Sequence, residues 1–135
     1  MIVVDTCVLS EAFRKKTNLR NSQIVECLSQ MIKDDWPLVI PGIVLQEFLT
    51  GFTADKSFQK GLDTLSGFNV NYADYEDHLM AARIRSQCHK NGIQSSSIDS
   101  LIAAITINLN GRLLTVDNDF KNISKVCHLK LFQFK

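Results

Sequence analysis

Short runs of apolar residues that are rich in β-branched side chains constrain this sequence more than any other feature. The first run is Ile2-Val3-Val4, and similar runs cover residues 38–40 and 113–116. A strand that is apolar on both faces has to be buried on both faces, as the strands of parallel sheets in α/β proteins are. The sequence therefore predicts short parallel strands at the centre of its core.

Helical patterns separate these runs, because between them apolar residues recur at three- and four-residue spacing. The expected helices cover residues 24–32, 43–52, 55–66, 73–90 and 98–109, with Asn91-Gly92 and Gly111 as stop signals. Weaker strand patterns lie at residues 68–70 and near the C-terminus, at Leu129, Leu131 and either Phe132 or Phe134. Strands that alternate with helices predict a three-layer α/β/α sandwich with a mostly parallel central sheet.

Length and composition predict one domain over residues 1–135, because 135 residues with 45% hydrophobic and 21% charged side chains suit a single core. The net charge is only +1, so any contact with a polyanion depends on local clusters of basic residues. The sequence has no leading basic segment before an apolar run and no stretch approaching the roughly 20 apolar residues that a membrane span needs. We therefore expect a cytoplasmic protein without a membrane segment.

The four cysteines favour reduced thiols over a disulfide framework, because they are scattered and form no C-x-x-C pair. The couples Cys88-His89 and Cys127-His128 leave a zinc site as an alternative. Their spacing differs from that of structural zinc sites, so the sequence favours the thiol interpretation.

Aspartates follow the apolar strand runs directly. Asp5 comes after the first run, and Asp117 and Asp119 come after the last. Ligands of open parallel sheets bind beyond the carboxyl ends of the strands, which makes these acids candidates for a binding site. Each also has a structural explanation, because aspartate is common in turns and at helix N-caps.

Two further acids lie on apolar helices. Glu47 projects between Ile43 and Val44, where a carboxylate is partly desolvated and needs a partner or a metal. Its alternative role is to reach solvent or to pair with an arginine. Asp99 lies in the first turn of its helix, where Ser96 to Asp99 also fit a capping box.

The joint arrangement of these acids points to a metal site. Two strand-end aspartates and two helical acids can converge on one pocket in this architecture, and clustered carboxylates stay ionised together only when cations neutralise them. A site made only of oxygen ligands suits hard ions such as Mg²⁺ or Mn²⁺. Such ions generate a hydroxide and stabilise in-line displacement at a phosphodiester.

Four motifs in this order make the chain resemble the PIN-domain family over essentially its whole length. They are Val-Val-Asp-Thr at 3–6, Val-Leu-Gln-Glu-Phe-Leu-Thr-Gly at 44–51, Ile-Asp-Ser-Leu-Ile-Ala-Ala at 98–104 and Leu-Thr-Val-Asp-Asn-Asp-Phe at 114–120. The resemblance implies a PIN-like fold whose catalytic metal ligands are Asp5, Glu47, Asp99 and Asp117. It also implies supporting roles for Thr6, Thr115 and Asp119, with Asp119 as the alternative fourth ligand. Cys7 departs from the pattern, since asparagine or serine is common at that position.

Stand-alone PIN domains of this size resemble VapC-type toxins of type II toxin-antitoxin pairs, which are Mg²⁺- or Mn²⁺-dependent endoribonucleases. The resemblance thus implies an RNA substrate, a small antitoxin partner and a homodimer. Arg14, Lys15, Lys16 and Lys121 are candidates for steering phosphates toward the acids, although each also suits a solvated surface. Arg83 and Arg85 suit either an interface between subunits or solvent.

Three other classes of protein are alternatives to a nuclease. A non-catalytic PIN-like module would bind RNA or a protein without cleavage, but all four acids are present. A phospho-receiver domain needs an acidic pair after its first strand, where Asp5-Thr6 offers a single acid. A dinucleotide-binding enzyme is excluded because no G-x-G-x-x-G follows any candidate strand.

Overall fold

The structure is a computed structural model that describes residues 1–13 and 19–134. It contains one sheet of four strands in the order β3-β2-β1-β4, and every neighbouring pair is parallel. The strands are β1 (Ile2–Val4), β2 (Leu38–Pro41), β3 (Asn69–Asn71) and β4 (Arg112–Leu114). The first and last strands of the chain are therefore neighbours, and their carboxyl ends lie side by side.

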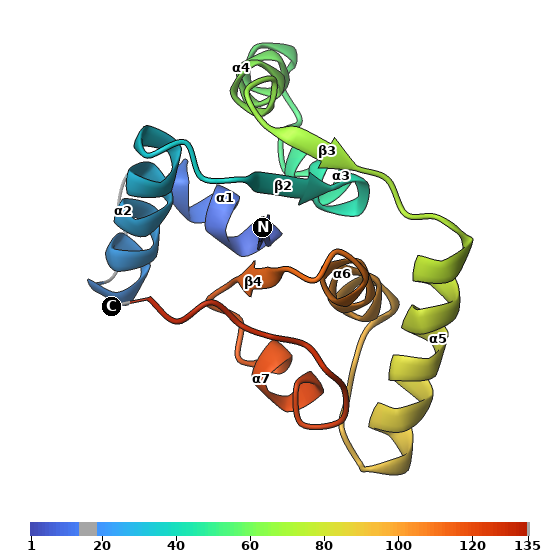
Figure 1. The fold of residues 1–135 in the computed structure, drawn as a ribbon. Helices are drawn as coiled ribbons and strands as arrows, with labels where there is room; N and C mark the ends of the chain where they lie inside the picture. Colours follow the sequence, from blue (N-terminus) through green and yellow to red (C-terminus); the bar gives the residue numbers. More distant parts are fainter. Residues whose placement is uncertain (14–18, 135) are drawn as a thin grey trace.

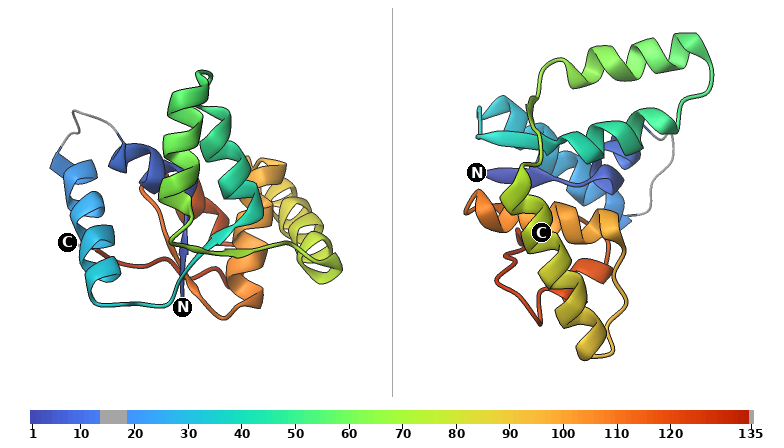
Figure 2. Two further views of the ribbon diagram at one scale, coloured as in Figure 1. Left: turned by 90° about the horizontal axis from the view of Figure 1, so that it is seen from above. Right: turned by 90° about the vertical axis from the view of Figure 1, so that its right-hand side faces the viewer.

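Seven helices are present in the described residues, and they surround the sheet (Figure 1). They are α1 (Thr6–Ala12), α2 (Leu19–Lys33), α3 (Gly42–Thr50), α4 (Asp55–Leu65), α5 (Tyr75–Lys90), α6 (Ser97–Asn108) and α7 (Asp119–Ile123). In Figure 1, α2 lies on one flank of the sheet and α5 on the other, where α5 packs against α6. Figure 2 shows α4 alongside α3 at one end of the molecule. The predicted α/β/α architecture with a parallel sheet is confirmed.

The strands form the centre of the core. Val3, Val4, Ile40, Leu113 and Leu114 have no exposed surface. Because neighbouring residues of a strand point to opposite faces, complete burial of Val3 and Val4 shows that helices cover both faces of β1. The predicted burial of the strands on both faces is therefore confirmed. Because β1 and β4 are parallel neighbours, Asp5 and Thr115, which follow them, lie at the same edge of the sheet.

Two helices were not predicted from the sequence, namely α1 and α7, which have only 7 and 5 residues. The expected C-terminal strand was overestimated, because the structure has a single parallel bridge between Leu131 and Leu113. The backbone hydrogen bonds Leu113 N–H to Lys130 O (2.9 Å) and Phe132 N–H to Leu113 O (2.8 Å) use up both polar groups of Leu113. The C-terminal segment therefore extends the sheet at one residue only.

Gly111 follows the end of α6, as the sequence suggested, and its backbone N–H donates to the Thr106 carbonyl oxygen at 3.0 Å. The helix α6 ends at Asn108, and the residue with a left-handed backbone is Asn110, whose φ is 53°. A Cβ atom at Gly111 would lie 3.1 Å from the carbonyl oxygen of Met1. A side chain at this position would crowd β1, because the start of β4 passes very close to the start of β1. Across the described residues, no helix combines the length and apolar character needed to cross a bilayer.

Candidate metal centre

Asp5 directly follows β1 and is 5% exposed. Its Oδ1 accepts a hydrogen bond from the Thr6 backbone N–H at 2.8 Å, so Asp5 also serves as the N-cap of α1. Its Oδ2 accepts from the Thr115 hydroxyl at 2.8 Å and from the Cys7 thiol at 3.2 Å. Three donors from two parts of the chain therefore fix the orientation of this carboxylate.

Thr115 connects the ends of the two central strands. Val4 is paired with Leu114 in the sheet, so the residues after them, Asp5 and Thr115, emerge next to each other. The Thr115 hydroxyl donates to Asp5 and accepts from the backbone N–H of Asp117 at 3.0 Å. One buried hydroxyl thus sets the positions of both strand-end aspartates.

Glu47 reaches the same edge of the sheet from α3. Its Oε1 accepts a hydrogen bond from the Thr6 hydroxyl at 2.8 Å, so Thr6 touches Glu47 with its side chain and Asp5 with its backbone. The helices that carry these residues are held together by three aromatic rings, Phe13, Phe48 and Phe52, with centroids 5.0 to 6.0 Å apart. Such aromatic packing fixes the distance between α1 and α3.

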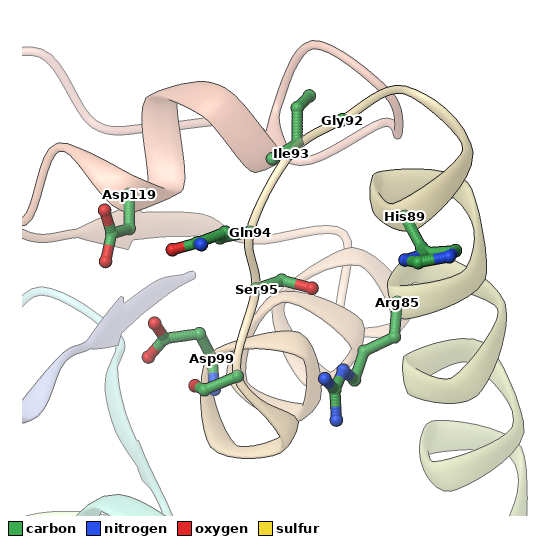
Figure 3. A pocket seen from close by; sticks show the side chains of 9 residues that line it. Arg85, His89, Gly92, Ile93, Gln94, Ser95, Asp99 and Asp119 are labelled. Carbon is green, nitrogen blue, oxygen red and sulfur yellow. The ribbon is translucent and has the colours of Figure 1, made fainter.

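Among the described residues, Asp99, Asp117 and Asp119 form a group in which each contributes an oxygen atom within 4.8 Å of the others, and Asp5 and Glu47 are not members of this group. Asp99 lies in the first turn of α6, where its backbone N–H donates to the Ser96 hydroxyl at 3.0 Å. Asp117 accepts a hydrogen bond from the Asp119 backbone N–H at 2.9 Å. Figure 3 shows the carboxylates of Asp99 and Asp119 on the same side of the intervening loop.

The electrostatics of the group are unfavourable for bare carboxylates. Burial, and then the neighbouring charges of Asp5 and Asp117, raise the pKa of Asp99 to about 6. Burial also raises the pKa of Asp5, although its three hydrogen-bond donors oppose the shift. Within the described part of the chain, no lysine or arginine forms an ion pair with any of these acids. A bound cation would stabilise the ionised carboxylates and so oppose both the desolvation and the repulsion between neighbouring charges.

The donor set fits a hard divalent cation. The acids and the nearby hydroxyls supply oxygen atoms only, which is the ligand type that Mg²⁺ and Mn²⁺ prefer. Burial and the adjacent Asp5 carboxylate raise the pKa of the Cys7 thiol to about 12, so without a cation this thiol is protonated and donates a hydrogen bond to Asp5. Its hydrogen bond to Asp5 was not anticipated from the sequence, where this cysteine was only a departure from a motif.

Of the four basic residues that the sequence suggested for phosphate binding, the structure describes only Lys121. Lys121 lines a cavity of about 290 Å³ together with Thr115 and Asp117. Arg14, Lys15 and Lys16 lie outside the described residues. The zinc alternative finds no support within residues 1–13 and 19–134, because the Cys88-His89 and Cys127-His128 couples form no cluster of three or more metal-binding side chains there.

A family model of the PIN domain matches residues 2–126. The chain belongs to the PIN-domain family. Comparison with curated protein sequences gives no match.

Solved structures share the fold of this PIN domain. FitAcB from Neisseria gonorrhoeae matches with a TM-score of 0.78 and 23% identity, over 98% of this chain and 97% of that one. VapBC2 from Rickettsia felis, bound to a DNA fragment from its promoter, gives the same TM-score and identity over 100% of both chains. VapC20 from Mycobacterium tuberculosis, described as a sarcin-ricin loop cleaving toxin, matches with a TM-score of 0.67 and 13% identity, over 90% and 93%.

Proposed function

We propose that this PIN domain is a divalent-metal-dependent endoribonuclease that hydrolyses RNA phosphodiester bonds and is the toxin of a type II toxin-antitoxin pair. The observation that carries the proposal is the acidic cluster at the sheet edge, where Asp99, Asp117 and Asp119 approach one another within 4.8 Å. The family match, and the description of one structural relative as an RNA-cleaving toxin, support the same activity.

In this proposal Asp5, Glu47, Asp99 and Asp117 hold the metal, and Asp119 either supports them or shares the fourth position. Mg²⁺ or Mn²⁺, when bound, lowers the pKa of a coordinated water and stabilises negative charge on the phosphodiester. The chain orients Asp5, Glu47 and the Asp117 backbone through hydrogen bonds with Thr6 and Thr115. Thr115 fixes Asp5 and the Asp117 backbone, and Thr6 fixes Asp5 and Glu47.

The test is incubation of the purified full chain with a mixed RNA pool in Mn²⁺, in Mg²⁺ and in EDTA. We expect cleavage with either metal and none with the chelator. Asp5→Asn and Asp99→Asn should abolish cleavage and preserve the fold, because each removes a ligand charge without opening a cavity. Asp63→Asn is the matched control, since Asp63 is exposed on α4. Full activity in Asp5→Asn, or intact RNA after incubation of the unsubstituted chain with Mn²⁺, contradicts the proposal, and RNA that is bound but left whole indicates a non-catalytic module.

We also propose that the protein is a cytoplasmic homodimer of single-domain subunits that a small antitoxin holds inactive. Support comes from relatives such as VapBC2 and a toxin-antitoxin complex from Klebsiella pneumoniae, which were solved with their antitoxins. Co-expression with the product of an adjacent small reading frame should yield a stable complex without ribonuclease activity. Light scattering on the purified chain should give the mass of a dimer, and a monomer at micromolar concentration contradicts the dimer.

A further inference from the structure

A cavity of about 720 Å³ opens beside the acidic cluster and carries charges of both signs. Asp99 and Asp119 line it on one side. Arg85 and His89 extend from α5 on the other side, and the connection that contains Gln94 and Ser95 passes between the two groups (Figure 3). The acids are accounted for by the proposed metal site, but the two basic side chains are not.

Arg85 has donors to spare. It is exposed, and its hydrogen bond to the Ser97 hydroxyl, at 2.9 Å from Nη1, is the single one it makes with the described residues. A guanidinium carries five N–H donors in a fixed plane, so most of them face the cavity or solvent. The Ser97 bond orients the side chain across the gap between α5 and α6 and holds it at the cavity wall.

His89 reinforces Arg85 because it lies four residues later on α5, which places both side chains on one face of the helix. The polar connection between the helices adds neutral donors, and the Gln94 side chain extends from it toward Asp119 in Figure 3. The cavity therefore offers a strip of hydrogen-bond donors that leads away from the acids.

Electrostatics require such a strip if the site acts on RNA. The five acids carry five negative charges, and two divalent ions would leave the pocket with a net negative charge. Phosphates on either side of the scissile one would then be repelled, and the whole chain has a net charge of only +1 to attract them. Local cations have to supply the attraction, and arginine suits phosphate because its planar fork forms paired hydrogen bonds.

We propose that Arg85, assisted by His89, binds a backbone phosphate of the RNA strand adjacent to the phosphate that is cleaved. The inference rests on the proposed nuclease function and names the wall along which its substrate lies. The cavity volume falls in the range of about 300 to 1,000 Å³ that is typical of sites for small organic ligands, so it has room for a nucleotide-sized unit.

The test measures RNA binding without cleavage, in the Asp5→Asn background with Mn²⁺ present, by fluorescence anisotropy of a labelled single-stranded oligonucleotide at several salt concentrations. We expect Arg85→Gln to weaken binding about tenfold. The slope of log affinity against log salt should fall by about 0.7, the value for one phosphate contact to a single strand. Arg85→Lys should keep the slope, because it keeps the charge. Arg83→Gln is the matched control, since Arg83 is exposed on the same helix but is absent from the cavity wall.

The same substitutions in the otherwise unsubstituted chain give a second readout, in which Arg85→Gln should raise KM about tenfold and change kcat less than twofold. If the unsubstituted chain cleaves RNA but Arg85→Gln binds and cleaves like Arg83→Gln, the phosphate site is wrong and the nuclease proposal stands. If the chain neither cleaves nor binds RNA, both proposals fail. Circular dichroism of each variant identifies an effect that comes from loss of folding.

Discussion

The raised pKa of Asp99 predicts that one substitution has opposite effects on stability with and without metal. At neutral pH without a cation, Asp99 is ionised in a place where burial and the charges of Asp5 and Asp117 disfavour ionisation. Asp99→Asn removes that charge with little change in volume. We expect the metal-free variant to be more stable than the unsubstituted protein at pH 7.5, although it has lost a proposed ligand.

The magnitude follows from the pKa shift. A rise from 3.8 to about 6 corresponds to at most about 3 kcal/mol. Asp99 is only half-buried, and screening by solvent reduces this to about 1 to 2 kcal/mol. Replacing Asp99 also removes the favourable interaction of its charge with the N-terminus of α6, which lowers the gain by about 0.3 to 1 kcal/mol. The net gain for Asp99→Asn is therefore about 1 kcal/mol.

The pH dependence has a defined sign. Because the folded-state pKa of Asp99 is above its unfolded value, the folded protein binds more protons between pH 3.8 and about 6. The contribution of Asp99 to stability is fully present below pH 3.8 and is lost as the pH rises through about 6. The stability difference between Asp99→Asn and the unsubstituted chain should grow across this interval and remain constant above it.

Urea unfolding followed by circular dichroism, in EDTA and in Mn²⁺, measures these free energies. At a Mn²⁺ concentration about 100 times its Kd, the unsubstituted chain should gain about 2.7 kcal/mol. Asp99→Asn should gain much less, so the order of stabilities reverses. Asp63→Asn controls for the loss of an exposed carboxylate on α4. A metal-free Asp99→Asn protein that is less stable at pH 7.5, or one that Mn²⁺ stabilises as much as the unsubstituted chain, refutes the reasoning.

Three further predictions concern the frame of the site. Thr115→Val should lower the free energy of unfolding by about 1 to 3 kcal/mol and weaken Mn²⁺ binding in a calorimetric titration, because the buried hydroxyl bonds to both strand-end aspartates. Thr115→Ser keeps the hydroxyl and should restore both the stability and the Mn²⁺ affinity. Gly111→Ala should destabilise the protein by about 1 to 3 kcal/mol in urea unfolding, because the new Cβ would lie 3.1 Å from the Met1 carbonyl oxygen. Gly67→Ala is the control, since a Cβ there meets nothing within 4 Å, and it should stabilise the protein by about 0.4 to 1 kcal/mol. Cys127→Ser should leave RNA cleavage and bound-metal content unchanged, and loss of metal would revive a zinc site.

The sheet was predictable from the sequence because its strands are buried on both faces, and continuous apolar runs record that burial directly. The short helices were not. The helix α1 has only 7 residues, which is about two turns. Its buried Val8 and Leu9 are adjacent in sequence, so they do not show the three- and four-residue spacing that distinguishes a helix from a strand. The close approach of Gly111 to Met1 was not predictable either, because it depends on how closely the starts of two strands pass, which is a tertiary property.

The candidate site was predictable as a set of acids but not as a network. Strand-end placement and motif order singled out Asp5, Asp99 and Asp117 before any geometry was known. The shared hydroxyl of Thr115, and the thiol of Cys7 that donates to Asp5, depend on which side chains face each other across β1 and β4. No local pattern encodes the contact between Thr115 and Asp5, which are 110 positions apart, because the register of the sheet decides it. The contact between Cys7 and Asp5 is local in sequence, but no motif used in the sequence analysis assigns it.

The hydrogen bond from Thr115 to Asp5 joins residues 110 positions apart, nearly the full length of the chain. During synthesis β1 is made before β4, so the carboxylate of Asp5 gains the Thr115 hydroxyl only after β4 and the residue that follows it have been made. A fragment that ends before β4 lacks Thr115, Asp117 and Asp119, and therefore two of the three acids that approach one another within 4.8 Å. If these acids form the proposed metal site, the site is assembled only after β4 and the loop that follows it have been made and packed beside β1.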